Sequence, residues 1–352
     1  MEAFGKIRHG GDWVGYERDY GKPPLDFSAS ISPLGLPDGV RRAAIAALGE
    51  ADRYPDPLCR ELRGALSDYH GVPAENIVCG NGAAELIDRL CRVLRPERAA
   101  VFAPCFGEYQ RALRAEGCAV TEIPLSRADN FRLTEETIGR IPEKLDVLFL
   151  CNPNNPTGLL TPKEILHRLL ERECFLIVDE CFLDFCERAA DYSLIGELSK
   201  YPRLVILRAF TKVWAMAGLR LGYALCGSAD LARDLQDCGQ PWAVSGVAQR
   251  AGTAALRETE YAEKLRALIG RERRRMLAEF EKLGLFTLPG EANFLLFFSA
   301  DKALDRKLRE RGILIRDCAD FTGLSEGWYR AALRTEAEND RLLAALKESL
   351  HG

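Results

Sequence analysis

A lysine between two apolar runs is the residue of this sequence best suited to covalent chemistry. Lys212 follows the run 204–207 and precedes a second run at 219–226. Partial removal from water disfavours the ammonium form, which leaves an amine that can condense with an aldehyde. Arg220 lies close behind it and offers a guanidinium fork for a phosphate. The segment predicts a Schiff-base lysine, although an isolated lysine near a strand is more often a surface charge.

A carboxylate at the end of another apolar run is the second candidate. Asp179 follows residues 175–178, which are apolar throughout. A carboxylate in such a place is costly unless a cation faces it. A protonated pyridine nitrogen would satisfy Asp179 and keep the ring an electron sink. A structural salt bridge is the alternative that this segment leaves open.

Three turns add side chains and backbone donors that suit a flat, phosphorylated cofactor. Asn155 lies in a rigid Pro- and Gly-containing turn at 152–158, where a carboxamide can donate to a phenolate oxygen. Gly82 and Ala83 open a helix after a strand, and backbone N–H groups at such a start bind anions. Phe106 opens a further strand-to-helix loop, where its ring could stack on a cofactor. Taken singly, a tight turn and a core phenylalanine explain the last two segments equally well.

The elements that must position these residues alternate along the chain. The strand candidates are residues 77–79, 100–103, 120–123, 147–151, 175–179, 205–207 and 221–225. Helix candidates include residues 40–48, 83–94, 106–116, 162–171 and 194–200. Strands that are apolar throughout and separated by helices predict a mostly parallel sheet covered on both faces. Ligands of such sheets gather at the carboxyl ends of the strands.

The length and the texture of the chain predict two domains. Its 352 residues exceed one ordinary domain. Beyond residue 240 a long charged helix (258–282) is followed by alternating short strands and helices, which suggest a smaller α+β domain. We therefore expect an amino-terminal segment (1–40) packed on the small domain, a large domain (41–238) and a small carboxy-terminal domain (239–352).

Composition excludes several classes of protein. A net charge of −4 argues against nucleic-acid binding through phosphate neutralisation. No stretch reaches the ~18 apolar residues of a membrane span. The four histidines form no HExxH pattern, so no metal is expected. The twelve cysteines form no CxxC pair and predict buried free thiols in a reducing cytoplasm, which makes a cytoplasmic location the expectation.

Taken together and in order, these motifs resemble the fold-type I, pyridoxal-phosphate-dependent aminotransferase family over essentially the whole chain. The resemblance implies an α/β fold with a seven-stranded, mostly parallel sheet in a large domain, plus a smaller α+β domain. It also implies that Lys212 captures the cofactor aldehyde, Asp179 binds the pyridine nitrogen, and Asn155 meets the ring hydroxyl. Phe106 would stack on the ring. The implied phosphate ligands are Gly82, Ala83, Thr211 and Arg220.

The same resemblance implies a homodimer and shows two departures. Tyr54, in Arg53-Tyr54-Pro55, is similar to the tyrosine that reaches the cofactor phosphate of the neighbouring subunit. Phe182 stands where many relatives carry a tyrosine that contacts the ring hydroxyl. Ala209 replaces a common Ser or Thr and so removes one phosphate donor.

Two branches of the family fit best: histidinol-phosphate aminotransferases and the threonine-phosphate decarboxylases of cobalamin biosynthesis. Local matches to the decarboxylases include His9-Gly10-Gly11-Asp12 and the block 315–339. That block supplies Arg316, Arg330 and Arg334, and several arginines suit a dianionic phosphate. His9 is a further candidate for contact with the substrate. Solvent-facing charge remains the alternative for Arg334.

The expected reaction is the conversion of L-threonine O-3-phosphate to (R)-1-aminopropan-2-yl phosphate. If Arg316 and Arg330 hold the substrate phosphate, the carboxylate can stand perpendicular to the ring and leave as carbon dioxide. Ser30, Ser32 and Ser245 replace asparagines of the decarboxylase pattern, which leaves serine phosphate or another small phosphorylated amino acid open as the substrate. A cofactor-binding protein without catalysis is the remaining alternative.

Overall fold

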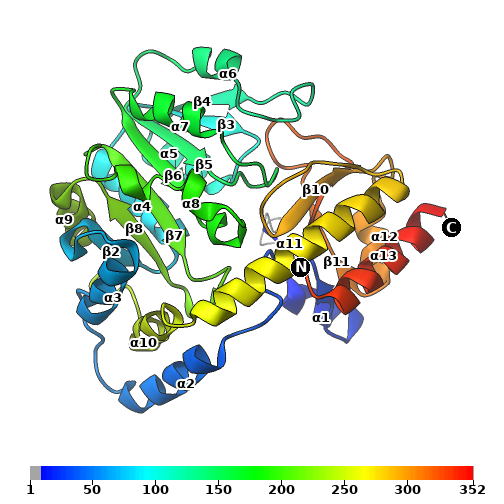
Figure 1. Ribbon diagram of the computed structural model, residues 1–352, viewed down its shortest axis with the longest axis horizontal. Coiled ribbons are helices and arrows are strands. Elements are labelled where there is room, and N and C mark those ends of the chain that lie inside the picture. The colour runs from blue at the N-terminus through cyan, green and yellow to red at the C-terminus, as the bar shows by residue number, and fades with distance from the viewer. Residues whose placement is uncertain (1–8, 352) are drawn as a thin grey trace.

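The computed structural model describes residues 9–351 (Figure 1). A seven-stranded sheet lies at the centre of its larger part. Its strand order is β2-β8-β7-β6-β5-β3-β4. The strands are β2 (Ile77–Gly80), β3 (Arg98–Ala103), β4 (Ala119–Pro124), β5 (Val147–Cys151), β6 (Phe175–Asp179), β7 (Leu204–Ala209) and β8 (Gly222–Cys226). Only β8 runs against its neighbours, while the other pairings are parallel. The predicted seven-stranded, mostly parallel sheet is confirmed.

Helices cover both faces of this sheet, which is why its strands are apolar along their whole length. On one face α4 (Ala83–Leu94), α5 (Glu108–Ala115) and α9 (Ala229–Cys238) bury side chains in one cluster with residues of β2, β3, β5, β6, β7 and β8. On the other face lie α3 (Arg60–His70), α7 (Lys163–Leu170) and α10 (Gly246–Ala255). Their buried side chains belong to a second core cluster, which extends into the carboxy-terminal part of the chain. The central strands β5 and β8 are buried at every position.

A second, antiparallel sheet lies beside the first and has the strand order β12-β13-β10-β9. Its strands are β12 (Arg316–Asp317), β13 (Trp328–Ala332), β10 (Phe294–Phe298) and β9 (Phe286–Thr287). Its helices are α12 (Leu304–Glu310) and α13 (Glu336–His351). In Figure 1 the long helix α11 (Thr259–Lys282) crosses from the large sheet to this smaller one. Over residues 9–351 no helix combines the length and the apolar character that a membrane crossing requires.

The amino-terminal part of the chain is tied to the smaller sheet region. It contains α1 (Trp13–Tyr20) and β1 (Leu25–Asp26). β1 pairs in parallel with β11 (Ile313–Leu314), and Ala332 N donates to Phe27 O at 2.8 Å. The first eight residues of the segment 1–40 lie outside the described residues, and the boundaries at 40 and 238 stay predictions.

One helix expected from the sequence does not form. The helix expected at 194–200 is wrong: only the 3-10 turn η4 (Ile195–Glu197) forms there. The buried carboxylate of Glu180 accepts Leu194 N at 2.9 Å and Ser193 Oγ at 2.9 Å, so it holds this stretch to the sheet in place of a helical ladder. The remaining helices and turns are α2 (Asp38–Ala47), η1 (Leu48–Glu50), η2 (Ala74–Asn76), α6 (Glu135–Gly139), η3 (Leu183–Phe185), α8 (Ala189–Tyr192) and η5 (Ala217–Leu219).

Candidate active site

The chemical candidates gather at one edge of the large sheet. Asp179 is the last residue of β6, Lys212 lies just beyond β7, and Asn155 follows β5. Gly82 lies between β2 and α4. Because β8 is the only reversed strand, β2, β5, β6 and β7 all end at this edge. Parallel topology therefore brings together residues that are far apart in the sequence.

Lys212 lies in surroundings that favour its uncharged amine. Burial, together with the positive charges of Arg330 and Arg220, lowers the pKa of Lys212 to about 8. Its Nζ lies 5.7 Å from the centre of the Phe182 ring. Its backbone oxygen accepts Ser32 N at 2.9 Å, which fixes the loop that carries it. A lowered pKa is what a Schiff-base lysine requires, and that role of Lys212 stays a prediction.

Asp179 is a buried carboxylate that lacks a cationic partner. Its side chain is 6% exposed, and within residues 9–351 it makes no ion pair. Oδ1 accepts Cys181 N at 3.0 Å, and Oδ2 accepts Tyr109 Oη at 2.6 Å. These donors orient the group without neutralising it. A positively charged ligand atom at the free side of Asp179 would supply the missing charge, whereas the structural salt bridge left open by the sequence is not found.

The turn before α4 and the loop after Lys212 bring the predicted phosphate ligands together. Gly82 precedes α4 with a φ of +84°, and a Cβ there would lie 2.7 Å from Arg220 Nη2. A Cβ at Gly222 would lie 2.4 Å from Ala83 N. The backbone contact at Gly222 and the positive φ of Gly82 both require glycine, and the close approaches place Arg220 beside the backbone N–H groups at the helix start. Thr211 is buried next to Lys212. The predicted phosphate ligands are therefore neighbours in the fold, and their role stays a prediction.

Arg330 joins the smaller sheet to the turn that carries Asn155. It is buried, and its guanidinium donates to Asn155 Oδ1 and, at 3.1 Å, to Ser28 O. The guanidinium carbon lies 4.9 Å from the centre of the Phe294 ring. Burial lowers the pKa of Arg330 to about 10. Because Arg330 occupies the amide oxygen of Asn155, the amide nitrogen remains as the donor for a phenolate.

Arg316 lies directly across the sheet from Arg330. The two are register partners on β12 and β13, so their side chains share one face. Arg316 Nη2 contacts both carboxylate oxygens of Asp320, at 2.8 and 2.7 Å. The Asp320 carboxylate thus binds the Arg316 guanidinium, so an anion fits beside Arg316.

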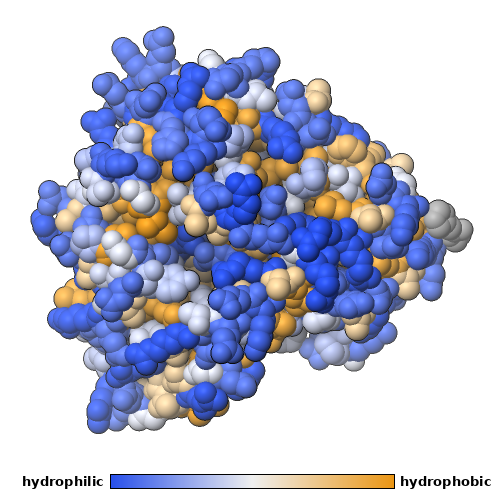
Figure 2. Space-filling view, in the orientation of Figure 1, coloured by the Kyte–Doolittle hydropathy of each residue, from blue (hydrophilic) through white to orange (hydrophobic). Residues whose placement is uncertain are grey.

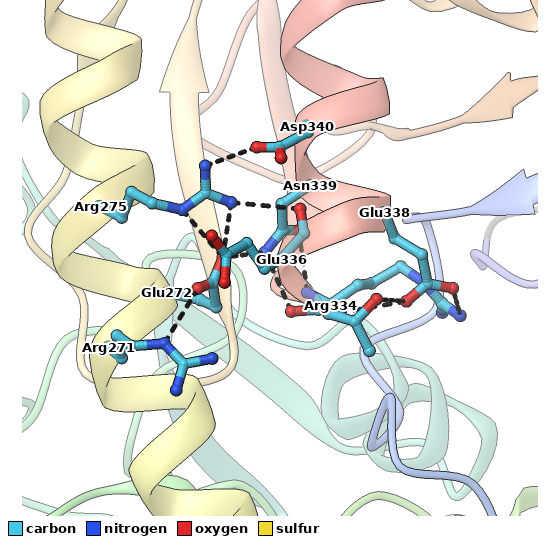
Figure 3. A network of polar contacts seen from close by, with 9 residues as sticks. Arg271, Glu272, Arg275, Arg334, Glu336, Glu338, Asn339 and Asp340 are labelled. Carbon is cyan, nitrogen blue, oxygen red and sulfur yellow. Dashed lines mark hydrogen bonds and ion pairs between the residues drawn. The ribbon is translucent and has the colours of Figure 1, made fainter.

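Arg334 takes part in a different network, shown in Figure 3. It donates to Glu338 Oε1 at 2.8 Å and to Asp26 O at 3.1 Å. The Asn339 amide binds Arg334 N and O and donates to the fully buried carboxylate of Glu272 on α11. This network anchors the end of β13, the strand that carries Arg330. A substrate contact by Arg334 stays a prediction.

His9, Phe106 and Tyr54 occupy different surroundings. His9 Nε2 pairs with Glu108 Oε1 at 2.9 Å, and its ring lies 5.8 Å from that of Phe106. This hydrogen bond, followed by that from Arg111, lowers the pKa of Glu108 to about 2. Tyr54 is 80% exposed and stacks on Trp242 at 4.4 Å. His9 thus lies beside the candidate stacking ring, while Tyr54 points to solvent.

The glycines after His9 have a structural explanation. A Cβ at Gly10 would lie 2.2 Å from Ser28 O, the atom that Arg330 binds. Gly11 has a φ of +94°, and its N–H donates to Ser28 Oγ at 2.8 Å. Only glycine allows this close approach. The segment is therefore packed against the backbone that Arg330 holds.

Sequence reasoning missed Tyr109 and Cys181, which both contact Asp179. Tyr109 lies three residues after Phe106, in the first turn of α5, and the two rings meet edge to face with centres 5.6 Å apart. That spacing was the available signal. The backbone N–H of Cys181 had none, because a main-chain donor leaves no mark in the sequence.

Comparison with known proteins identifies the family of the chain. Residues 22–346 match the family described as aminotransferase class I and II. Threonine-phosphate decarboxylase of Salmonella typhimurium strain LT2 is 38% identical, over 99% of this chain and 96% of that protein. Histidinol-phosphate aminotransferase of Desulfitobacterium hafniense is 37% identical, over 92% and 91%. The solved histidinol-phosphate aminotransferase of Clostridium acetobutylicum superposes with a TM-score of 0.86 at 30% identity, over 93% and 99%.

The chain belongs to the aminotransferase class I and II family, whose members are pyridoxal-phosphate-dependent enzymes. Pyridoxal 5′-phosphate is accordingly its cofactor, as the sequence predicted. The residues present fit this group: Lys212 is a low-pKa amine for the aldehyde, and Asp179 is an uncompensated carboxylate for the pyridine nitrogen. The Gly82 turn with Arg220 suits the phosphate.

The lowered pKa of Lys212 predicts how cofactor loading depends on pH. Only the neutral amine attacks an aldehyde, so below the pKa the loading rate should rise about tenfold per pH unit. The rise should level off above about pH 8, the pKa of Lys212 in the fold. Stopped-flow absorbance after mixing apoprotein with pyridoxal 5′-phosphate measures this rate. A plateau reached only near the ordinary lysine pKa of 10.5 would contradict the expected environment.

Proposed function

We propose that this enzyme decarboxylates an O-phospho amino acid, converting L-threonine O-3-phosphate to (R)-1-aminopropan-2-yl phosphate in cobalamin biosynthesis. The observation that carries the proposal is the pair Arg316 and Arg330, which face each other across β12 and β13. Two guanidinium groups on one face suit a dianionic phosphate better than a single carboxylate. The similarity to the Salmonella decarboxylase supports the same proposed reaction.

Phosphate binding at this pair requires an exchange of partners. Asp320, which is exposed, occupies Arg316, and a phosphate that arrives there would displace it. A phosphate carries more charge and offers more acceptor oxygens than the carboxylate it replaces. Arg330 donates hydrogen bonds to Asn155 Oδ1 and Ser28 O, and these contacts fix the position of its guanidinium. His9, next to Phe106, can add a further donor.

The chain's own residues then determine which bond of the substrate reacts. The bound cofactor supplies an electron sink for the electron pair released at the substrate Cα. Asp179 holds the proton on the ring nitrogen, which maintains that sink. With Arg316 and Arg330 engaged by the phosphate, the substrate carboxylate has no arginine to hold it in the ring plane and can leave. Lys212 Nζ, with its pKa of about 8, returns a proton to Cα.

Histidinol-phosphate transamination is the second candidate, and one contact favours it. Arg330 binds Asn155 and lies close enough to Lys212 to lower its pKa. In that position one arginine can bind the α-carboxylate of glutamate. Histidinol phosphate carries its phosphate in place of that carboxylate, so Arg330, with Arg316 beside it, would bind the phosphate in the other half-reaction. The similarity to the Desulfitobacterium aminotransferase is nearly as high as that to the decarboxylase.

A substrate panel separates the two reactions. Purified holoenzyme is incubated with O-phospho-L-threonine or O-phospho-L-serine, and carbon dioxide and aminoalkyl phosphate are measured. A parallel reaction contains histidinol phosphate and 2-oxoglutarate, and glutamate is measured. We expect carbon dioxide from phosphothreonine and no glutamate. Glutamate without carbon dioxide would assign the aminotransferase reaction instead.

We further propose that the enzyme is a homodimer whose interface includes Tyr54. The face shown in Figure 2 is largely hydrophilic, with hydrophobic areas between the charged side chains. Large apolar side chains are nevertheless exposed within the segment 34–54 and at Trp242, which stacks on Tyr54: Leu34, Ile45, Leu48, Tyr54 and Trp242. Such a set marks an interaction surface. Sedimentation equilibrium should give twice the chain mass of 39.2 kDa, and a monomer that binds cofactor fully would contradict the role of Tyr54.

A further inference from the structure

Tyr109 makes a short hydrogen bond to the carboxylate that faces the cofactor ring. Its Oη donates to Asp179 Oδ2 at 2.6 Å, and both side chains are buried. The other oxygen, Oδ1, accepts the Cys181 backbone N–H at 3.0 Å. Each oxygen of the carboxylate therefore accepts a hydrogen bond from an uncharged donor. Its remaining lone pairs are available for a ring nitrogen.

The fold holds the Tyr109 ring from two sides. It stacks on Phe149 of β5 with ring centres 5.0 Å apart and an interplanar angle of 13°. Its edge meets Phe106, the candidate stacking residue, at 5.6 Å and 81°. Burial and the adjacent Asp179 raise the pKa of Tyr109 well above its usual range, so the phenol keeps its proton and acts as the donor. Removal of the hydroxyl alone would leave both ring contacts in place.

We propose that Tyr109 is a positioning residue that fixes the orientation of Asp179 and keeps the shared proton on the pyridine nitrogen of the cofactor. This inference rests on the cofactor assignment alone. It is independent of whether the reaction is decarboxylation or transamination, because both use the same ring nitrogen.

The proton between Asp179 and the ring can reside on the carboxylate or on the ring nitrogen. A hydrogen bond from Tyr109 stabilises the carboxylate and makes it a weaker base. The weaker the base, the more completely the proton stays on the ring nitrogen, where it draws electrons from the ring. Without the hydroxyl, Asp179 would attract the proton more strongly and the ring would be less electron-poor. The nitrogen that links Lys212 to the cofactor would then become more basic.

The test compares Tyr109→Phe with a matched control. Tyr223→Phe also removes the hydroxyl of a buried tyrosine, but that hydroxyl bonds His70 at 2.8 Å. Each apoprotein is titrated with pyridoxal 5′-phosphate and with its carbocyclic analogue, in which CH replaces the ring nitrogen. We expect Tyr109→Phe to weaken binding of the true cofactor about tenfold, the effect of one charge-assisted hydrogen bond. Binding of the analogue should change less than about twofold, because only the nitrogen engages Asp179.

A spectroscopic titration gives a second readout that packing alone does not move. The pH midpoint of the visible absorption of the bound cofactor should rise in Tyr109→Phe and stay unchanged in Tyr223→Phe. Replacement of Tyr109 by 3,5-difluorotyrosine, a stronger donor of similar shape, should lower the midpoint. This variant also decides the matter if Tyr109→Phe does not fold. Equal loss of affinity for cofactor and analogue, or an unchanged midpoint in both Tyr109 variants, would overturn the proposal.

Discussion

Lys212→Ala is expected to abolish turnover with every substrate while leaving the protein folded. The substitution removes the amine that we propose both binds the cofactor aldehyde and moves the proton at Cα. Loss of the proton-transfer function alone corresponds to at least about 10²–10⁴-fold in rate. Product formation, whether carbon dioxide or glutamate, measures the loss. The visible absorption that arises from covalent attachment should disappear as well.

The fold should tolerate this change because Lys212 contributes little to stability at neutral pH. The protein lowers its pKa from 10.5 to about 8, so the folded state disfavours the charged amine. That penalty is present below pH 8 and is relieved as the pH rises toward 10.5. The apoprotein of Lys212→Ala should therefore melt no lower than the wild type at pH 7, as measured by calorimetry.

A chemical control locates the attachment point directly. Borohydride reduction of the wild-type holoenzyme followed by peptide mass spectrometry should place the pyridoxyl group on Lys212. Lys200→Ala is a suitable control variant, since Lys200 is exposed and, among residues 9–351, forms an ion pair with Glu197 on the surface. It should keep full activity and the normal adduct. An adduct on another lysine, or activity retained by Lys212→Ala, would contradict the assigned nucleophile.

The strands and the residues at their ends could be predicted because their signals are local. Five consecutive apolar residues define β5, and four define β6 before its terminal Asp179, so the position of the carboxylate followed from its neighbours. Parallel strands then place Asp179, Asn155 and Lys212 at one edge. No side-chain contact had to be known for that step.

The contacts that complete the site could not be predicted because they join distant segments. Arg330 and Asn155 are 175 positions apart, and Tyr109 and Asp179 are 70 apart. The partner of an arginine depends on the tertiary fold, which is why Arg316 and Arg334, so close in the sequence, have different partners. The error at 194–200 has the same origin, since the Glu180 carboxylate holds that stretch from another strand end.

Arg330→Ala is the second substitution with a large expected effect, because Arg330 touches both the cofactor-binding turn and the substrate side of the site. Removal of a buried, hydrogen-bonded charge that pairs with a ligand anion costs about 2–5 kcal/mol. We expect kcat/KM to fall about a thousandfold, which corresponds to roughly 4 kcal/mol. Steady-state kinetics on the active substrate measures it. The loss is expected for either proposed reaction.

Two further measurements assign this loss to a local cause. Arg330 is a positive neighbour that lowers the pKa of Lys212, so Arg330→Ala should move the pH plateau of cofactor loading above about 8. Arg334→Ala is the matched control, because Arg334 is bound by Glu338 and the Asp26 carbonyl. If Arg334 only anchors the strand end, its loss should lower the melting temperature more than it lowers kcat/KM. A thousandfold loss in Arg334→Ala with an unchanged plateau would instead make Arg334 the principal ligand of the substrate anion, and the pair Arg316 and Arg330 would lose that role.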